Sequence, residues 1–155
     1  VPPDHEDSNY RMASRSFLDK VPLNKDNVLR IRGELDPVDA AREYEDTLRG
    51  RSASGIYVHD LILLGMGEDG HTASLFPGTS ALNEEKRWVV SNHVPQKGET
   101  RITFTYPIIN AAKKILFLIR GQRKRRIVDR VLSGESDLPA SLVNPESESV
   151  VWLLD

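Results

Sequence analysis

The sequence predicts an α/β fold, a three-layer arrangement in which helices flank an open, mainly parallel sheet. Continuous apolar residues at 61–64, inside the strand predicted at 60–65, and at 115–119 are typical of strands buried on both faces of such a sheet. Amphipathic helical patterns and short turns alternate with the predicted strands. The chain has 155 residues, 39% of them hydrophobic and 28% charged, which suits one globular domain over 1–155.

The N-terminal part is predicted to form a helix followed by a short strand. Ser8 or Asn9 can cap a helix that runs to about Lys20. The apolar residues over 28–32 then predict a strand.

A second helix is predicted after Asp36. Aspartate caps a helix, and Pro37 suits the first helical position. Gly50 is expected to end this helix. One face is expected to bury Val38, Ala41, Tyr44 and Leu48.

The remaining elements alternate in the same way. Strands are predicted at 60–65, 88–92, 101–106, 115–119 and 149–153, and helices at 107–113 and 122–133. The basic cluster at 120–130 is the strongest shift in composition.

Composition and charge exclude several functions. The net charge of −2 gives no overall positive field for nucleic acid. No apolar stretch reaches the ~18–20 residues of a membrane span. The absence of cysteine excludes disulfides, thiolate metal sites and a cysteine nucleophile, and fits a cytoplasmic protein. The four histidines lack metal-binding spacing, so we expect neither a metal nor another cofactor.

The stretch GMGEDGHTASLFPG at 65–78 contains the pattern G-x-G-x-x-G that is found in dinucleotide-binding turns. Glu68 and Asp69 would lie beside the pyrophosphate, and each like-charge contact at ~4 Å costs about 1 kcal/mol in water and about 4 at an intermediate dielectric. The acidic residue that should contact the ribose would be Glu84 or Glu85, which precede the next strand instead of ending it. These residues argue against a dinucleotide.

The same loop can instead hold His71 at the carboxyl end of a buried strand, where ligands bind in open α/β sheets. Asp69 lies close enough in sequence to orient the imidazole ring. Histidine, with an ordinary pKa near ~6.5, suits general-base catalysis near neutral pH. The alternative is that His71 only caps a helix that begins near Thr72, and spacing alone leaves both interpretations open.

The stretch LLGMGEDGHTASLFPG closely resembles the signature of the 6-phosphogluconolactonases, which belong with the glucosamine-6-phosphate isomerases. Three further segments resemble the same family in the same order: VPPDHEDSNYRMA at 1–13, RITFTYPIINAAKKILFLIRGQRKRRIV at 101–128 and LPASLVNP at 138–145. The four segments are spread along most of the chain, from residue 1 to residue 145.

This resemblance implies a Rossmann-like fold of the sugar-phosphate isomerase/lactonase type and the hydrolysis of 6-phosphogluconolactone. It implies that His71 is the base that activates water, with Asp69 beside it. The sequence has no G-x-S-x-G elbow for a nucleophilic serine.

The substrate of such an enzyme is a small sugar phosphate, and its phosphate needs cations. The resemblance assigns Arg101 and Lys124 to it. We also expect Asn9, in the segment DSNY, to line the site, and Gly67 and Gly70 to belong to the substrate-binding residues. Taken alone, Lys124 belongs to a basic run of a kind that is usually solvated, and Asn9 could equally cap a helix.

The sequence departs from the family at its N-terminus, because the glycine- and serine-rich phosphate loop and the Asp-Glu-Arg motif are absent. We therefore expect a fold that is incomplete at the N-terminus, lacking about the first third of such an enzyme. One rival is a glucosamine-6-phosphate isomerase or deaminase, but apolar residues at 75–78 stand where that group has Asn-Glu-Pro. The other is a truncated sugar-phosphate-binding module without activity. The oligomeric state is not predicted.

Overall fold

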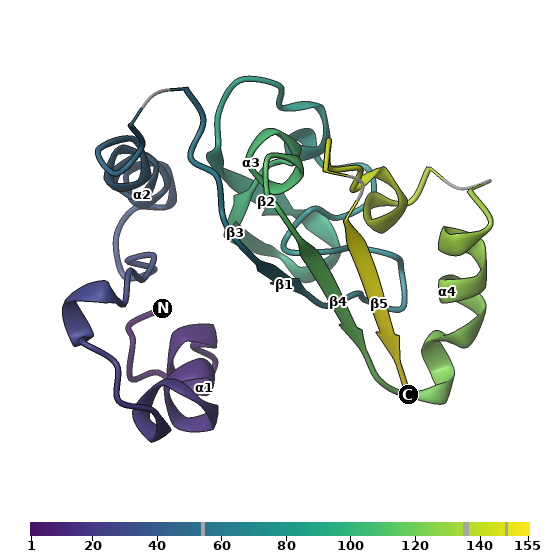
Figure 1. Cartoon of the computed structure of the whole chain (residues 1–155), viewed down its shortest axis with the longest axis horizontal. Helices are drawn as coiled ribbons and strands as arrows, with labels where there is room; N and C mark the ends of the chain where they lie inside the picture. The colour runs from purple at the N-terminus through teal and green to yellow at the C-terminus, as the bar shows by residue number, and fades with distance from the viewer. Residues whose placement is uncertain (54, 135–136, 148) are drawn as a thin grey trace.

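The computed structural model describes residues 1–53, 55–134, 137–147 and 149–155. It contains a parallel sheet in the order β1-β4-β5, built from β1 (Ile62–Leu64), β4 (Ile115–Ile119) and β5 (Val150–Leu154). A separate antiparallel hairpin pairs β2 (Val89–Val94) with β3 (Glu99–Phe104) (Figure 1). The predicted α/β class with a parallel sheet and helices is confirmed.

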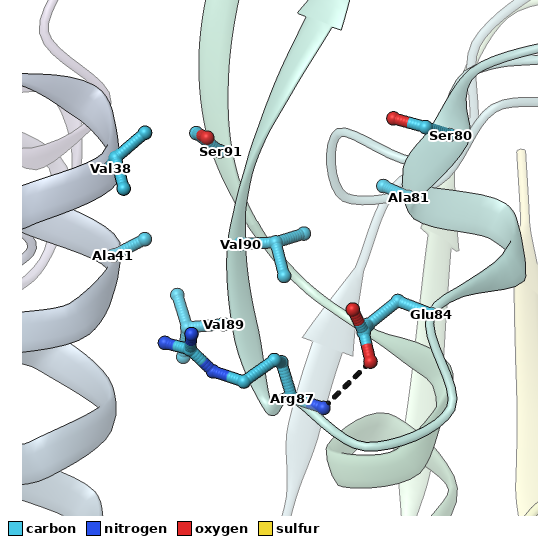
Figure 2. Close-up of a pocket in the computed structure, with 9 residues that line it drawn as sticks. All are labelled: Val38, Ala41, Ser80, Ala81, Glu84, Arg87, Val89, Val90 and Ser91. Atoms are coloured by element: carbon cyan, nitrogen blue, oxygen red, sulfur yellow. Dashed lines mark hydrogen bonds between the residues drawn. The ribbon is translucent and has the colours of Figure 1, made fainter.

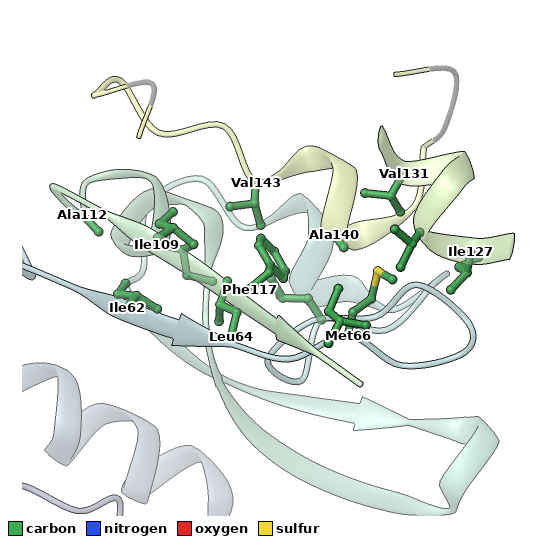
Figure 3. Close-up of a cluster of buried hydrophobic side chains, with 14 of the residues drawn as sticks. Ile62, Leu64, Met66, Ile109, Ala112, Phe117, Ile127, Val131, Ala140 and Val143 are labelled. Carbon is green, nitrogen blue, oxygen red and sulfur yellow. The ribbon is translucent and has the colours of Figure 1, made fainter. Parts of the chain in front are cut away.

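The main core lies on one face of the parallel sheet. Ile62 pairs with Ile115, and Ile115 pairs with Val150, so alternate apolar side chains of the three strands align in rows. Figure 3 shows this face, with Phe117 of β4 at the centre and Ile127 and Val131 of α4 (Arg125–Leu132) packed over it. The helix presents its apolar side to the sheet, while Leu132 at its end is 51% exposed.

The opposite face of the sheet carries exposed apolar side chains. Leu63 is 59% exposed, Leu118 48% and Leu153 53%. The prediction that the run at 60–65 is buried on both faces is therefore wrong. The long helix α2 (Pro37–Arg49) packs on the β2–β3 hairpin and leaves this face open.

The N-terminal segment is more irregular than predicted. Ser8 caps α1 (Asn9–Ser16) by accepting a hydrogen bond from the backbone N–H of Arg11. The helix does not continue to Lys20, because Phe17 leaves the helical conformation and a 3₁₀ turn, η1 (Leu18–Lys20), follows.

The predicted strand at 28–32 is wrong. After the 3₁₀ turn η2 (Lys25–Asn27), Val28 is extended, but the segment belongs to no sheet in the part of the chain that the structure describes. Its Arg30 side chain instead binds Glu34 through two hydrogen bonds of 2.9 and 2.7 Å. Apolar residues alone do not make this segment a strand, because a strand also needs a neighbouring strand to hydrogen-bond with.

Helix α2 begins and ends as predicted. Asp36 accepts hydrogen bonds from the backbone N–H groups of Val38 and Asp39. The buried face differs from the predicted one, because Val38 is 53% exposed whereas Glu45 is buried beside Leu48.

The Glu45 carboxylate joins α2 to the start of the hairpin. One oxygen accepts hydrogen bonds from Arg87 Nε at 2.9 Å and from the backbone N–H groups of Trp88 and Val89 at 3.0 and 3.1 Å. The other oxygen accepts from Arg49. Burial opposes ionisation of Glu45, but these hydrogen bonds hold its pKa below the ordinary value.

The remaining elements are short. They are the α-helix α3 (Tyr106–Asn110) and the 3₁₀ turns η3 (Ser80–Asn83), η4 (Pro95–Lys97), η5 (Gln122–Lys124) and η6 (Pro139–Leu142). The predicted helix at 107–113 is thus a shorter helix, and the one at 122–133 begins as a 3₁₀ turn. None of the helices in the described ranges is long and apolar enough to cross a membrane.

Candidate active site

The loop at 65–78 leaves the carboxyl end of β1 and holds His71 against Asp69. His71 Nδ1 lies 2.5 Å from Asp69 Oδ1, and the same oxygen accepts the backbone N–H of His71 at 3.1 Å. The imidazole ring stacks on the buried Phe76 ring at 4.0 Å between centroids and 22° between planes. With Nδ1–H donating to the carboxylate, Nε2 is the basic nitrogen.

The Asp69 carboxylate remains ionised beside this ring. Partial burial works against its charge, but hydrogen bonds from the His71 ring and backbone lower its pKa below the ordinary value. The pair therefore has the arrangement of a base and its orienting carboxylate.

Two glycines of the loop, Gly67 and Gly70, suit this arrangement. Gly67 donates its N–H to the His71 carbonyl at 2.9 Å, and a Cβ at Gly67 would overlap the His71 ring. Gly70 has a φ of 78°, and a Cβ there would contact Leu138 at 3.0 Å. Gly65 has open space around it. Turns follow His71 in place of a helix, so the helix-capping interpretation is wrong.

The hairpin holds the other half of the loop through Ser74. Its backbone N–H donates to Thr103 Oγ1 at 3.1 Å, and its carbonyl accepts from Asn92 Nδ2 at 2.8 Å. Asn92 is fully buried and also donates to Thr79 Oγ1 at 2.9 Å. The sequence interpretation missed Asn92 and Thr103, although a polar side chain inside an apolar strand pattern was a visible signal.

Asn9 and Arg101 line one cavity of 420 Å³ between α1, α2 and β3. Ser74 of the loop lines it too, so the cavity adjoins the segment that carries His71. Arg101 Nη2 pairs with Glu99 Oε2 at 2.6 Å. Because Ser8 provides the helix cap, the Asn9 side chain is not needed for capping.

Lys124 lies elsewhere, at the N-terminal end of α4, where it lines a cavity of 270 Å³ with Asp129 and Asp155. The neighbouring Arg123 reaches the loop, since its Nε lies 3.4 Å from Glu68 Oε1. The structure thus brings His71 and Asp69 together, and Asn9 and Arg101 together, but Lys124 does not line the cavity of Asn9 and Arg101.

A further cavity of 290 Å³ lies between α2, β2 and η3 (Figure 2). Glu84 accepts the backbone N–H of Arg87 at its rim. None of the site residues predicted from the sequence lines it.

Metal ligands do not gather at any of these places. Across the part of the chain that the structure describes, no group of three or more His, Cys, Asp or Glu side chains could hold a metal ion.

Comparisons with known proteins give a consistent picture. The family model of glucosamine-6-phosphate isomerases/6-phosphogluconolactonase matches residues 1–152. The chain is 42% identical to 6-phosphogluconolactonase 3, chloroplastic, of Arabidopsis thaliana, and 38% identical to the 6-phosphogluconolactonase of Rattus norvegicus. All of this chain is matched in both cases, but it spans only 51% and 62% of those proteins.

Solved structures also match the whole length of this chain. The crystal structure of devB protein matches with a TM-score of 0.89 and 34% identity over 100% of this chain and 67% of that chain. A monomeric glucosamine-6-phosphate deaminase matches with a TM-score of 0.79 at 24% identity, over 100% of this chain and 68% of that one, which demonstrates a shared fold alone.

Proposed function

The chain belongs to the family of glucosamine-6-phosphate isomerases and 6-phosphogluconolactonases, and from this premise we propose that its protein hydrolyses 6-phospho-D-glucono-1,5-lactone to 6-phospho-D-gluconate in the pentose phosphate pathway. The observation that carries the proposal is the Asp69–His71 pair, held in a turn that Gly67 makes possible. Relatives that bear the lactonase name support the choice of substrate.

In this reaction His71 acts as a general base. Its Nε2 takes a proton from water while the water oxygen bonds to the lactone carbonyl carbon. The tetrahedral intermediate then collapses, the bond from that carbon to the ring oxygen breaks, and the ring oxygen takes the proton back from His71. Asp69 stabilises the protonated ring in between, and general-base help of this kind contributes ~10²–10⁴-fold.

Arg101 and Asn9 are proposed to contact the sugar phosphate in the cavity that they share. A guanidinium can bind a phosphate through two parallel hydrogen bonds, provided that Glu99 releases it. Lys124 is proposed as a second cation for the anionic substrate, supported by its place beside Arg123, which reaches the loop. Gly67 and Gly70 contribute by shaping the loop.

The cytosol is our proposal for the compartment, supported by the lack of cysteine. The similar A. thaliana protein is named chloroplastic, so cell fractionation is the deciding measurement.

The proposed function is tested with the protein expressed from its complete coding sequence. We expect hydrolysis of the lactone and none of the deamination of glucosamine 6-phosphate. His71→Ala should lower kcat by about 10²-fold or more and leave binding of 6-phosphogluconate within about twofold, because only the proton transfer is lost.

Arg101→Ala and Lys124→Ala provide the matched comparison, since both should raise KM and leave kcat largely unchanged. An unchanged rate in His71→Ala removes His71 as the base. Turnover of glucosamine 6-phosphate without lactone hydrolysis makes the protein a deaminase, and binding of 6-phosphogluconate without either reaction makes it a binding module.

A further inference from the structure

Two buried polar atoms without a partner belong to residues that face each other across the hairpin. Asn92 of β2 is the direct cross-strand partner of Arg101 of β3. Side chains of such partners project from the same face of a sheet, with Cβ atoms about 4.5–5.5 Å apart. Within the described ranges, Asn92 Oδ1 and Arg101 Nε are both buried and make no hydrogen bond. One is an acceptor and the other carries a donor hydrogen.

The orientation of the Asn92 amide is determined by its other contacts. Its nitrogen donates to the Ser74 carbonyl at 2.8 Å and to Thr79 Oγ1 at 2.9 Å. A flipped amide would place its oxygen against the Ser74 carbonyl, where two acceptors would repel. The oxygen is therefore the atom left for Arg101.

We propose that Asn92 is a positioning residue of the sugar-phosphate site, whose amide oxygen accepts the Nε–H of Arg101 when the guanidinium binds the phosphate ester of the substrate. This inference rests on the proposed function, because it concerns the same Arg101.

The structure shows the first of the two states of Arg101 that such a role requires, and the proposal adds the second. In the first state, Arg101 Nη2 lies 2.6 Å from Glu99 Oε2. The Glu99 side chain is 53% exposed. A phosphate replaces that carboxylate through charge-assisted hydrogen bonds to the terminal nitrogens. Nε–H is then directed to the buried Asn92 oxygen, which also relieves an unpaired buried acceptor.

The same amide also fixes the loop that carries His71. Its nitrogen binds the Ser74 carbonyl, and Asn92 is the cross-strand partner of Arg101, so in this proposal one side chain links the loop of the catalytic ring to the phosphate ligand. A substrate must span this distance, so Asn92 contributes to the choice of phosphorylated over unphosphorylated lactone.

The test is a double-mutant cycle on lactone hydrolysis. Asn92→Leu keeps the side-chain volume and removes both polar atoms. We expect it to raise KM by about tenfold in the wild-type background, since a hydrogen bond to a charged group is lost. In the Arg101→Ala background the same change should raise KM by less than about twofold.

Thr79→Val is the matched control, because it removes one acceptor of the Asn92 amide nitrogen and leaves the amide oxygen in the side chain. Its KM should stay within about twofold of the wild type. If Asn92→Leu does not fold, Asn92→Ala is measured in the same cycle. The proposal is overturned if Asn92→Leu raises KM equally in both backgrounds or does not raise it at all. It is also overturned if Thr79→Val raises KM as much as Asn92→Leu does.

Failure of the proposed function gives a different result. A protein that does not hydrolyse the lactone refutes the function, and the cycle is then measured as the Kd of inorganic phosphate. Loss of phosphate affinity in Asn92→Leu that disappears in the Arg101→Ala background supports the pairing, and its absence overturns it.

Discussion

At the scale of single residues, the loop after β1 restrains one imidazole ring by contact and hydrogen bonding. Asp69 fixes Nδ1 of His71, Phe76 supports the ring face, and Gly67 leaves the space that the ring occupies. One glycine of the pattern that suggests a nucleotide, Gly67, is thus required by the space that the His71 ring occupies.

Gly67→Ala tests this restraint. The added methyl group overlaps the His71 ring and must displace it, and a displacement of about 1 Å at a reacting group can lower a rate about 10²-fold. We expect kcat for lactone hydrolysis to fall by about that factor. Gly65→Ala is the control, since its methyl group meets open space, and its kcat should not change. Wild-type kcat in Gly67→Ala would contradict the steric role.

The sequence predicts some of these residues and not others. His71 and Asp69 lie two positions apart, so their contact is local and can be predicted from the sequence. The pairing of Asn92 with Arg101 depends on the register of β2 against β3, which no local pattern fixes. The separation of Lys124 from Arg101 is likewise a property of the tertiary fold.

At the scale of elements, Glu45 is the main polar link between α2 and the β2–β3 hairpin. It is 3% exposed, and its carboxylate satisfies two backbone N–H groups and the side chains of Arg49 and Arg87. Removing the carboxylate leaves the N–H groups of Trp88 and Val89 unpaired.

Glu45→Ala should therefore lower the free energy of unfolding by about 2–4 kcal/mol near neutral pH. The control Glu43→Ala removes a half-exposed carboxylate that pairs with exposed Arg32, and should change the free energy of unfolding by less than about 0.5 kcal/mol. Urea unfolding measures both. Equal destabilisation by the two variants would contradict the role of Glu45.

The pH dependence of this difference follows from the lowered pKa of Glu45. The folded protein binds a proton at Glu45 less readily than the unfolded chain does, so stability is gained above the unfolded-state pKa of about 4.3. It is lost as pH falls through the folded-state pKa. The gap between wild type and Glu45→Ala should narrow as unfolding is measured from about pH 7 down to about pH 3.

The elements themselves were predictable where their signals were local. Asp36 and Pro37 start α2 because capping acts within one turn. The apolar segment at 28–32 looks like a strand but has no partner, and the run at 60–65 looks buried on both faces although Leu63 is exposed. Partnering and burial are decided by distant parts of the chain.

At the scale of the whole molecule, the outer face of the parallel sheet is a continuous apolar surface. Leu63 pairs with Leu116 and Leu116 with Val151, while Leu118 pairs with Leu153 in the next row. Parallel sheets are almost always covered on both faces, so a surface of this kind favours contact with other apolar groups.

The 155-residue chain expressed by itself should bind a fluorescent dye of exposed apolar surfaces and self-associate as its concentration rises. Replacing Leu63 and Leu118 with lysine should reduce both, because the charges interrupt both rows. Asn83→Lys adds a lysine on an exposed residue away from this face and should reduce neither. Light scattering and dye fluorescence measure the outcome, and equal association in all variants would contradict the role of this face.

The order of strands also sets how the chain folds in time. The β2–β3 hairpin joins neighbours in sequence, whereas Ile62 must find Ile115 and Ile115 must find Val150 before the parallel sheet exists. The chain loses entropy when such long loops close, before the strand contacts that stabilise them have formed. Parallel pairing is therefore intrinsically slow. The hairpin that holds Asn92 and Arg101 can form early, while the strand that delivers His71 remains unpaired until β4 arrives. During that interval the apolar strands are the part of the chain most exposed to aggregation.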